Sequence, residues 1–302
     1  MNQNTSPARR LGTDASVLIT GASGGLGKAF AVEAASRGWS LFLTDVQIEP
    51  LETLASGLRR TYGVPVRVLT CDLTDPVSRA ALFQRLRADG LRFWALINVA
   101  GTDYEGPFFE QTSQQIRTII RLNVEGTLEM IHAMLELRDP LSPFRIINVA
   151  SLAAFYPMPV KATYAASKRF LLDFSLALRE EVRPQGVTVT VLCPAGLPTT
   201  PGCVQAIEAQ GFLGQLTTQD IGSVANLTLN CALAGRAVVI PGAANRILQV
   251  LGSLMPAPLV ARLISWRWRS ARQKVAFKLR LPELETVRPI KYHTPAGCPE
   301  YK

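Results

Sequence analysis

A tyrosine and a lysine lie four residues apart in the segment YAASK, at Tyr164 and Lys168, inside a stretch with the pattern of a helix. Residues at i and i+4 share one face of a helix, so the ammonium can lie beside the phenol. A free phenol has a pKa of about 10, and a partly desolvated ammonium lowers it by roughly one to three units. The pair therefore predicts a general acid and base near neutral pH.

Ser151 follows the apolar run RIINVA and precedes this pair in the chain. If that run is a strand, the serine hydroxyl lies at the carboxyl edge of a sheet, where open α/β folds bind ligands. Each residue also has a structural explanation, because Tyr–Lys pairs are common on helix surfaces and serines cap turns. The functional interpretation therefore depends on a cofactor site in the same chain.

A glycine-rich turn supplies that site. In VLITGASGGLGKAF, the glycines Gly21, Gly25 and Gly27 follow an apolar run and precede a helical pattern. Glycines let the backbone turn tightly and approach a pyrophosphate, and the helix N-terminus beyond them offers unpaired N–H groups. A plain glycine turn is the alternative, but a strand before and a helix after favour a dinucleotide site. Ser23 and Leu26 of the same turn are predicted to belong to it.

Asp45 ends the next apolar run. A carboxylate there accepts hydrogen bonds from the adenosine ribose hydroxyls and repels a 2′-phosphate. Because no lysine or arginine follows closely, the sequence predicts NAD as the cofactor and makes NADP the less favoured one. A helix cap is the alternative role for Asp45. After the third apolar run, Asp72 and Leu73 are predicted at the adenine, with a turn cap as the alternative for Asp72.

The elements that position these residues follow from an alternation of short apolar runs and helical stretches. Near-continuous apolar runs are typical of parallel strands buried on both faces. We expect strands at 16–20, 41–44, 66–70, 93–98, 145–150, 187–192 and 237–241, and helices ending near 38 and at about 49–62, 75–89, 112–137 and 162–183. The alternation predicts an α/β fold, a Rossmann-type doubly wound parallel sheet of about seven strands with helices on both faces. We expect a loose lead at 1–14, a catalytic domain at 15–245 and a C-terminal helical extension at 246–302.

Composition excludes several classes of function. The chain has 302 residues and is 48% hydrophobic, which is ample for one large core. Its five cysteines lack CxxC spacing and its two histidines form no ligand cluster, so we expect reduced thiols, no metal site and a cytoplasmic location. Residues 1–14 lack the apolar segment of a secretory signal.

Six motifs together resemble the short-chain dehydrogenase/reductase family. They are TGASGGLG, CDL, NVAG, NV at Asn123, INVAS and YAASK, in register from about residue 15 to 200. The resemblance implies that Tyr164 is the catalytic acid and base and that Ser151 orients and polarises the substrate carbonyl or alcohol. It implies that Lys168 activates the tyrosine and holds the nicotinamide ribose, and that Asn123 supports a water in a proton relay. A homodimer or homotetramer is also implied.

The same resemblance places cofactor-binding residues in two more segments. One is the loop at 98–101, with Asn98, Ala100 and Gly101 near the adenine-side ribose. The other is CPAGLPTT near the nicotinamide, with Pro194, Gly196 and Thr199. The chain departs from the family pattern twice: Val99 stands where an asparagine is usual, and Ala195 separates a proline and a glycine that are usually adjacent.

The substrate side is almost uncharged. Residues 196–216 carry a single charge at Glu208, and the loop at 153–162 adds Phe155, Tyr156 and Met158. A neutral lining predicts a small, neutral, lipophilic secondary alcohol or ketone, such as a steroid or an acyl compound. Packing of these loop side chains on the protein itself is an equally weighted alternative. A cofactor-binding regulator or scaffold without turnover is the alternative function from another class.

The C-terminal extension carries most of the net charge of +9, because residues 261–302 hold ten Lys/Arg against three Glu, or +7. An uncharged stretch at 247–261 precedes them, is interrupted by Pro256 and Pro258, and is too short to span a membrane. Three interpretations of the extension stay open. It could make a peripheral membrane contact through 247–280, and this contact could be the main function of the protein. It could instead form a lid over the substrate pocket or a nucleic-acid-binding patch. The last lacks any binding motif, so we expect no nucleic-acid partner.

Overall fold

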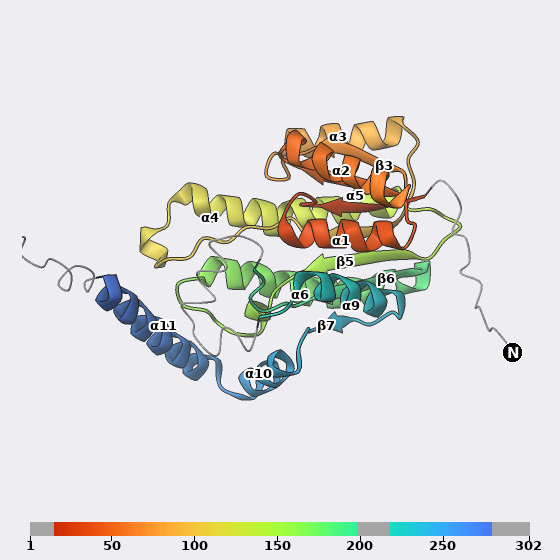
Figure 1. Ribbon diagram of the computed structural model, residues 1–302. Helices are drawn as coiled ribbons and strands as arrows, with labels where there is room; N and C mark the ends of the chain where they lie inside the picture. Colours follow the sequence, from red (N-terminus) through yellow and green to blue (C-terminus); the bar gives the residue numbers. More distant parts are fainter. Residues whose placement is uncertain (1–14, 199–217, 280–302) are drawn as a thin grey trace, which may run out of the picture.

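The computed structural model describes residues 15–198 and 218–279, and side chains as far as residue 268. Within these residues, seven strands alternate with helices along the chain (Figure 1). The strands are β1 (Ser16–Thr20), β2 (Leu41–Asp45), β3 (Val66–Thr70), β4 (Phe93–Asn98), β5 (Phe144–Val149), β6 (Val187–Leu192) and β7 (Val238–Val239). The helices are α1 (Gly25–Ser36), α2 (Ile48–Tyr62), α3 (Pro76–Ala88), α4 (Ser113–Ile120), α5 (Thr127–Glu136), α6 (Ala162–Val182) and α9 (Ile221–Leu233), followed by the C-terminal pair α10 (Ala243–Leu254) and α11 (Ala257–Leu279).

The strands form one parallel sheet in the order β3-β2-β1-β4-β5-β6-β7, which confirms the predicted Rossmann-type fold. β1 lies between β2 and β4, and Thr20 pairs with Asn98 at their carboxyl ends. The order of the strands reverses at this point, because the chain moves outward to β3 and then returns to the other side of β1. A crevice at the carboxyl ends of β1 and β4 is where such sheets bind dinucleotides.

Helices cover both faces of the sheet (Figure 1). α1, α2 and α9 cover one face, where Phe30, Leu51 and Leu229 belong to a common core. α3, α5 and α6 cover the other face, where Leu82 and Met130 belong to a second core. All six residues of β4 are buried, as expected of a strand covered on both sides.

The helix expected at 112–137 contains a π-helical turn. α4 begins with a capping box between Thr112 and Gln115, and α5 ends at Glu136, but between them the six residues Arg121–Gly126 form the π turn η2. At the end of this turn, a Cβ on Gly126 would lie 2.6 Å from the carbonyl oxygen of Leu73. Such wide turns are often found at functional sites, and here the turn carries Asn123.

The C-terminal part differs from the prediction in two ways. The helix α9 is not among those predicted, although its buried positions have helical spacing; they are Val224, Ala225, Thr228, Leu229 and Ala232. The last strand is only two residues long. Beyond it, α10 and α11 are separated at Pro256, whereas Pro258 lies in the first turn of α11, where proline is tolerated. None of the described helices is long and apolar enough to cross a membrane.

Candidate active site

The turn between β1 and α1 has no space for side chains at two of its glycines. Gly21 has φ +61°, and a Cβ there would lie 2.8 Å from the backbone of Ala100. A Cβ on Gly27 would lie 2.0 Å from the carbonyl oxygen of Gly21. The turn therefore lies directly against α1, which begins at Gly25 and is anchored by the buried Leu26. This backbone fits a pyrophosphate, because the N–H groups of the first helical turn point to the carboxyl edge of the sheet.

Asp45 is joined to this turn by hydrogen bonds. Its Oδ2 accepts from the backbone N–H of Ser23 at 2.9 Å and from the Ser23 hydroxyl at 2.6 Å, and its Oδ1 accepts from the N–H of Val46 at 2.7 Å. An ionised carboxylate has about four acceptor sites, so Asp45 retains capacity for another donor such as a ribose hydroxyl. The N-cap of α2 is Gln47 rather than Asp45.

The loop after β4 is fixed by buried polar side chains. Asn98 is 3% exposed and lies within the sheet, where its Nδ2 donates to Oδ1 of Asn148 at 2.9 Å. Asn148 in turn donates to the hydroxyl of Ser175 at 2.9 Å. The Oγ1 of Thr20 accepts from the N–H groups of the two residues after Asn98, at 3.1 and 3.3 Å. Asn98 therefore supports the loop from inside the sheet, and the loop backbone faces the glycine-rich turn.

Tyr164 and Lys168 lie one turn apart in the first half of α6. The Nζ of Lys168 is 5.7 Å from the centroid of the Tyr164 ring and donates to the carbonyl oxygen of Val149 at 2.9 Å. Lys168 is only 4% exposed. Burial lowers the pKa of its ammonium to about 8, and the negative charge of Asp103 acts in the opposite direction. Lys168 therefore carries its proton at neutral pH, next to the phenol.

Ser151 follows β5 directly and begins the short helix η3 (Leu152–Phe155). Its Oγ accepts a hydrogen bond from the N–H of Ala153 at 3.1 Å. The N–H of Leu152 donates to the carbonyl oxygen of Pro194 at 2.8 Å, which joins this segment to the end of β6. Accepting one bond does not use the hydroxyl proton, so Ser151 both caps the turn and can donate to a ligand.

Asn123 connects three elements of the site. Its Oδ1 accepts from the N–H of Thr102 at 2.9 Å, and its Nδ2 donates to the carbonyl oxygen of Thr102 at 3.0 Å and to the Ser167 hydroxyl at 3.1 Å. A Cβ on Gly101 would lie 3.1 Å from Nζ of Lys168 and 3.2 Å from Oδ1 of Asn123. The two side chains therefore converge on Gly101, which leaves them room only because it is glycine.

A charged cluster beside the site is not predicted from the sequence. The Nζ of Lys161 is 2.5 Å from Oδ2 of Asp103 and 3.2 Å from Oε2 of Glu105, and it lies 5.9 Å from the centroid of the Tyr164 ring. Asp103 and Glu105 follow the NVAG motif, and Lys161 precedes α6. Charges flanking two motifs in otherwise neutral segments are the signal that could have identified this cluster.

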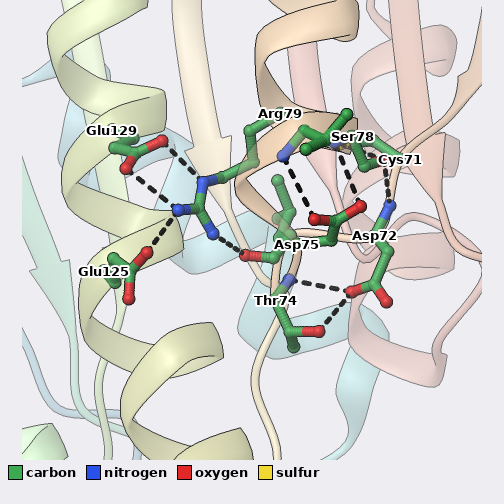
Figure 2. A network of polar contacts seen from close by, with 10 residues as sticks. Cys71, Asp72, Thr74, Asp75, Ser78, Arg79, Glu125 and Glu129 are labelled. Atoms are coloured by element: carbon green, nitrogen blue, oxygen red, sulfur yellow. Dashed lines mark hydrogen bonds and ion pairs between the residues drawn. The ribbon is translucent and has the colours of Figure 1, made fainter.

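Arg79 on α3 is the centre of a second network of polar contacts, which the sequence does not predict (Figure 2). Its fully buried guanidinium donates to the carbonyl oxygen of Leu73 at 2.7 Å. It also binds both carboxylate oxygens of Glu129, at 2.6 and 2.9 Å, and pairs with Glu125. Because Glu125 belongs to η2, Arg79 joins the loop after β3 to the turn that carries Asn123.

The remaining predicted residues lie at the edges of this site. Asp72 is exposed, and its Oδ1 accepts from the N–H and hydroxyl of Thr74 at 2.8 and 2.7 Å, so in this structure it stabilises a turn. Pro194 is buried just after β6 and Gly196 is exposed. Thr199 and most of the predicted substrate segment, including Glu208, lie outside the described residues.

α10 packs on the loop that follows Ser151. A Cβ on Gly252 would lie 2.2 Å from Cε1 of Tyr156, so this helix touches the tyrosine ring at its glycine. Burial raises the pKa of Tyr156 to about 12. Phe155 packs against the buried cluster around Leu171. These two loop side chains thus pack on the protein itself, and the C-terminal extension lies next to the site.

Residues 15–208 match the family described as short chain dehydrogenase. The match includes β1 to β6 and all four residues predicted to be catalytic. The chain belongs to the short-chain dehydrogenase family. This confirms the resemblance seen in the motifs and makes the protein a member of an oxidoreductase family with an NAD(P)-binding Rossmann fold.

Individual short-chain dehydrogenases are moderately similar to this chain. The 17-beta-hydroxysteroid dehydrogenase type 3 of Mus musculus is 31% identical over 186 residues, which is 60% of each protein. The very-long-chain 3-oxoacyl-CoA reductase of Anas platyrhynchos is 32% identical over 189 residues, 61% of this chain and 60% of the relative. A solved short-chain dehydrogenase from Sphingobium yanoikuyae in complex with NADPH is 28% identical with a TM-score of 0.66, covering 91% of this chain and 99% of the other. The chain therefore spans about 60% of the length of the curated relatives it matches.

Proposed function

We propose that this protein is an NAD-dependent oxidoreductase that interconverts a secondary alcohol and a ketone on a neutral, lipophilic substrate. The observation that carries the proposal is the pair on α6, with the Lys168 ammonium buried against Val149 and beside the Tyr164 ring. A buried cation next to a phenol favours the phenolate, which is what a tyrosine needs to act as a base.

The chemistry is divided among these side chains. Ser151 donates its hydroxyl proton to the substrate oxygen and polarises the carbonyl. In the reducing direction Tyr164 gives its proton to the developing alkoxide, and in the oxidising direction the phenolate takes the alcohol proton. When bound, the nicotinamide cofactor supplies or accepts the hydride. Asn123 positions the segment around Lys168 through the Ser167 hydroxyl and the loop after β4 through Thr102. It would also support the water that returns the proton to solvent.

The cofactor would be held along the carboxyl edge of the sheet. The backbone from Gly21 to Gly27 would bind the pyrophosphate and Lys168 the nicotinamide ribose. Asp45 would accept from the adenosine ribose hydroxyls, which is the reason for proposing NAD. The similarity to a protein in complex with NADPH makes NADP the alternative to be separated by experiment.

The substrate class rests on two observations. The names of two relatives refer to a hydroxysteroid, which is lipophilic, and to a very-long-chain 3-oxoacyl-CoA, whose acyl chain is lipophilic although its CoA part is charged. Phe155 and Tyr156 of the described loop pack on the protein itself, so the second observation is the apolar helix α10, which lies against this loop beside the site. A lipophilic ketone or secondary alcohol fits such surroundings better than a charged metabolite.

The test is a panel of steroid and acyl ketones and alcohols with NAD and NADP, followed by Tyr164→Phe on the best substrate. This variant keeps the ring and removes the transferable proton, so kcat should fall by roughly 10²–10⁴-fold while NADH binding is unchanged. Tyr62→Phe on α2 is the matched control and should retain full activity. Near wild-type turnover by Tyr164→Phe contradicts the mechanism. If the wild-type protein binds NADH but turns over none of the substrates, the result favours the alternative function, a cofactor-binding regulator or scaffold.

A further inference from the structure

The outward side of α10 is apolar and exposed. Ile247, Val250, Leu251 and Leu254 are 60, 51, 53 and 77% exposed. Their spacing of i, i+3, i+4 and i+7 places them on one face of the helix. The opposite face holds the helix to the protein, because the buried Asn245 and the contact of Gly252 with Tyr156 lie there. α10 is thus anchored on one side and presents four large apolar side chains on the other.

The first half of α11 presents a similar surface with arginines added. Leu259, Leu263 and Trp266 are 46, 47 and 66% exposed and share a face at i, i+4 and i+7. Arg262 and Arg267 are also exposed and flank this face. Arginine can bury its aliphatic stem against apolar surroundings while its guanidinium reaches polar groups. Apolar and aromatic side chains between arginines are typical of helices that lie in a membrane interface.

The charge of this pair of helices has a single sign. From residue 243 to 279 the sequence contains no Asp or Glu and seven cations: Arg246, Arg262, Arg267, Arg269, Arg272, Lys274 and Lys278. A second copy of the chain seated symmetrically on this surface would bring like charges together, which opposes association. An anionic lipid surface instead offers both an apolar layer and negative charge.

We propose that the exposed faces of α10 and α11 bind the surface of an anionic lipid bilayer. We name these two faces together the C-terminal apolar surface, which consists of Ile247, Val250, Leu251, Leu254, Leu259, Leu263 and Trp266. The apolar side chains enter the boundary between headgroups and acyl chains, and the arginines pair with lipid phosphates. Figure 1 shows both helices at the outer edge of the molecule beyond β7, with α11 projecting from the α/β body. Because α10 also packs on Tyr156, the contact would bring the loop after Ser151 close to the lipid.

The test is flotation of the full-length protein with vesicles of phosphatidylglycerol mixed with phosphatidylcholine, and with phosphatidylcholine alone, at low and high salt. We expect binding to the anionic vesicles at low salt and release at high salt. Leu254→Glu should weaken binding at least tenfold, whereas Leu141→Glu, at a side chain that is 92% exposed elsewhere, should not. Removing one arginine charge with Arg262→Gln or Arg267→Gln should weaken binding to the anionic vesicles roughly fivefold. The control Arg60→Gln, at an exposed arginine on α2, should leave this binding unchanged.

Tryptophan emission gives a second readout that does not depend on enzyme activity. Trp266 is exposed, whereas Trp94 is 2% exposed and Trp39 and Trp268 are half-buried. A blue shift on adding anionic vesicles should therefore be reduced in Trp266→Phe and persist in Trp94→Phe. If Trp94→Phe does not fold, brominated lipids provide the test instead. They should quench part of the emission of the wild-type protein, and this quenching should be smaller in Trp266→Phe. Full-length protein that stays out of the floating fraction at low salt overturns the proposal. If the protein is an oligomer in solution without vesicles and Leu254→Glu dissociates it, the surface binds a second copy of the chain, and the lipid proposal is overturned.

Discussion

The carbonyl oxygen of Gly21 occupies the place where a side chain on Gly27 would begin, because a Cβ on Gly27 would lie 2.0 Å from it. This contact sets the curvature of the turn between β1 and α1. Gly27 is therefore required by close packing of backbone on backbone at the proposed dinucleotide site, not by an unusual φ angle.

We expect Gly27→Ala to open this turn. The added methyl group meets backbone atoms that cannot rotate away, so the variant should lose about 1–3 kcal/mol of stability and at least tenfold in NADH affinity. Fluorescence titration and thermal unfolding measure the two effects. Gly57→Ala is the matched control, since nothing lies within 4 Å of a Cβ there, and it should stabilise α2 by about 0.5–1 kcal/mol. Equal NADH affinity in both variants contradicts the assignment.

The buried ammonium of Lys168 predicts a pH-dependent stability. Its folded pKa of about 8 lies below its ordinary value of 10.5, so burial of the charge destabilises the folded protein most below pH 8. Between these values the unfolded chain binds more protons than the folded one, and wild-type stability from this group rises with pH. The stability of Lys168→Met relative to wild type should therefore fall by roughly 2 kcal/mol between about pH 7.5 and 9.5.

Urea unfolding across this pH range measures the difference, and Lys28→Met at an exposed position of α1 is the control. A difference for Lys168→Met that stays constant with pH would show that the ammonium is not desolvated. Lys168→Met should also abolish turnover, since no cation would then favour the phenolate of Tyr164.

Arg79 should matter for stability and for cofactor binding. Arg79→Met keeps most of the side-chain volume but leaves the carbonyl oxygen of Leu73 without its donor, at a cost of about 1–3 kcal/mol. Because that loop is predicted at the adenine, KM for the cofactor should rise more than kcat falls. Arg85→Met on the same helix removes an exposed pair with Asp89 and should change stability by less than about 0.5 kcal/mol. Equal effects of the two substitutions would refute the structural role of Arg79.

Asp45 should determine the choice between the two cofactors. Asp45→Ser combined with Val46→Arg removes the carboxylate and adds a cation, so preference should move from NAD toward NADP by at least tenfold in kcat/KM. Asp75→Asn neutralises a carboxylate at the N-cap of α3 while keeping a capping side chain, and should leave the preference unchanged. A wild-type protein that already prefers NADP would overturn the role of Asp45.

Local patterns in the sequence predict much of this site. The strands at 16–20, 93–98 and 187–192 have the predicted bounds, because a strand buried on both faces reads as an apolar run. The strand at 66–70 also has the predicted bounds, although it lies at the edge of the sheet and only Val66 is buried. Tyr164 and Lys168 could be paired because four residues make about one helical turn. The glycine-rich turn was recognisable because it joins a strand to a helix at a short distance along the chain.

The tertiary structure alone decided how distant segments meet. The sequence places Arg79 and Glu129 on separate helices, and Asp103 and Lys161 after separate strands, and no periodicity relates them. They meet because parallel strands with helical crossovers bring their carboxyl ends to one edge of the sheet. The π turn around Asn123 and the contact of Gly252 with Tyr156 likewise depend on packing between elements, which short-range patterns do not encode.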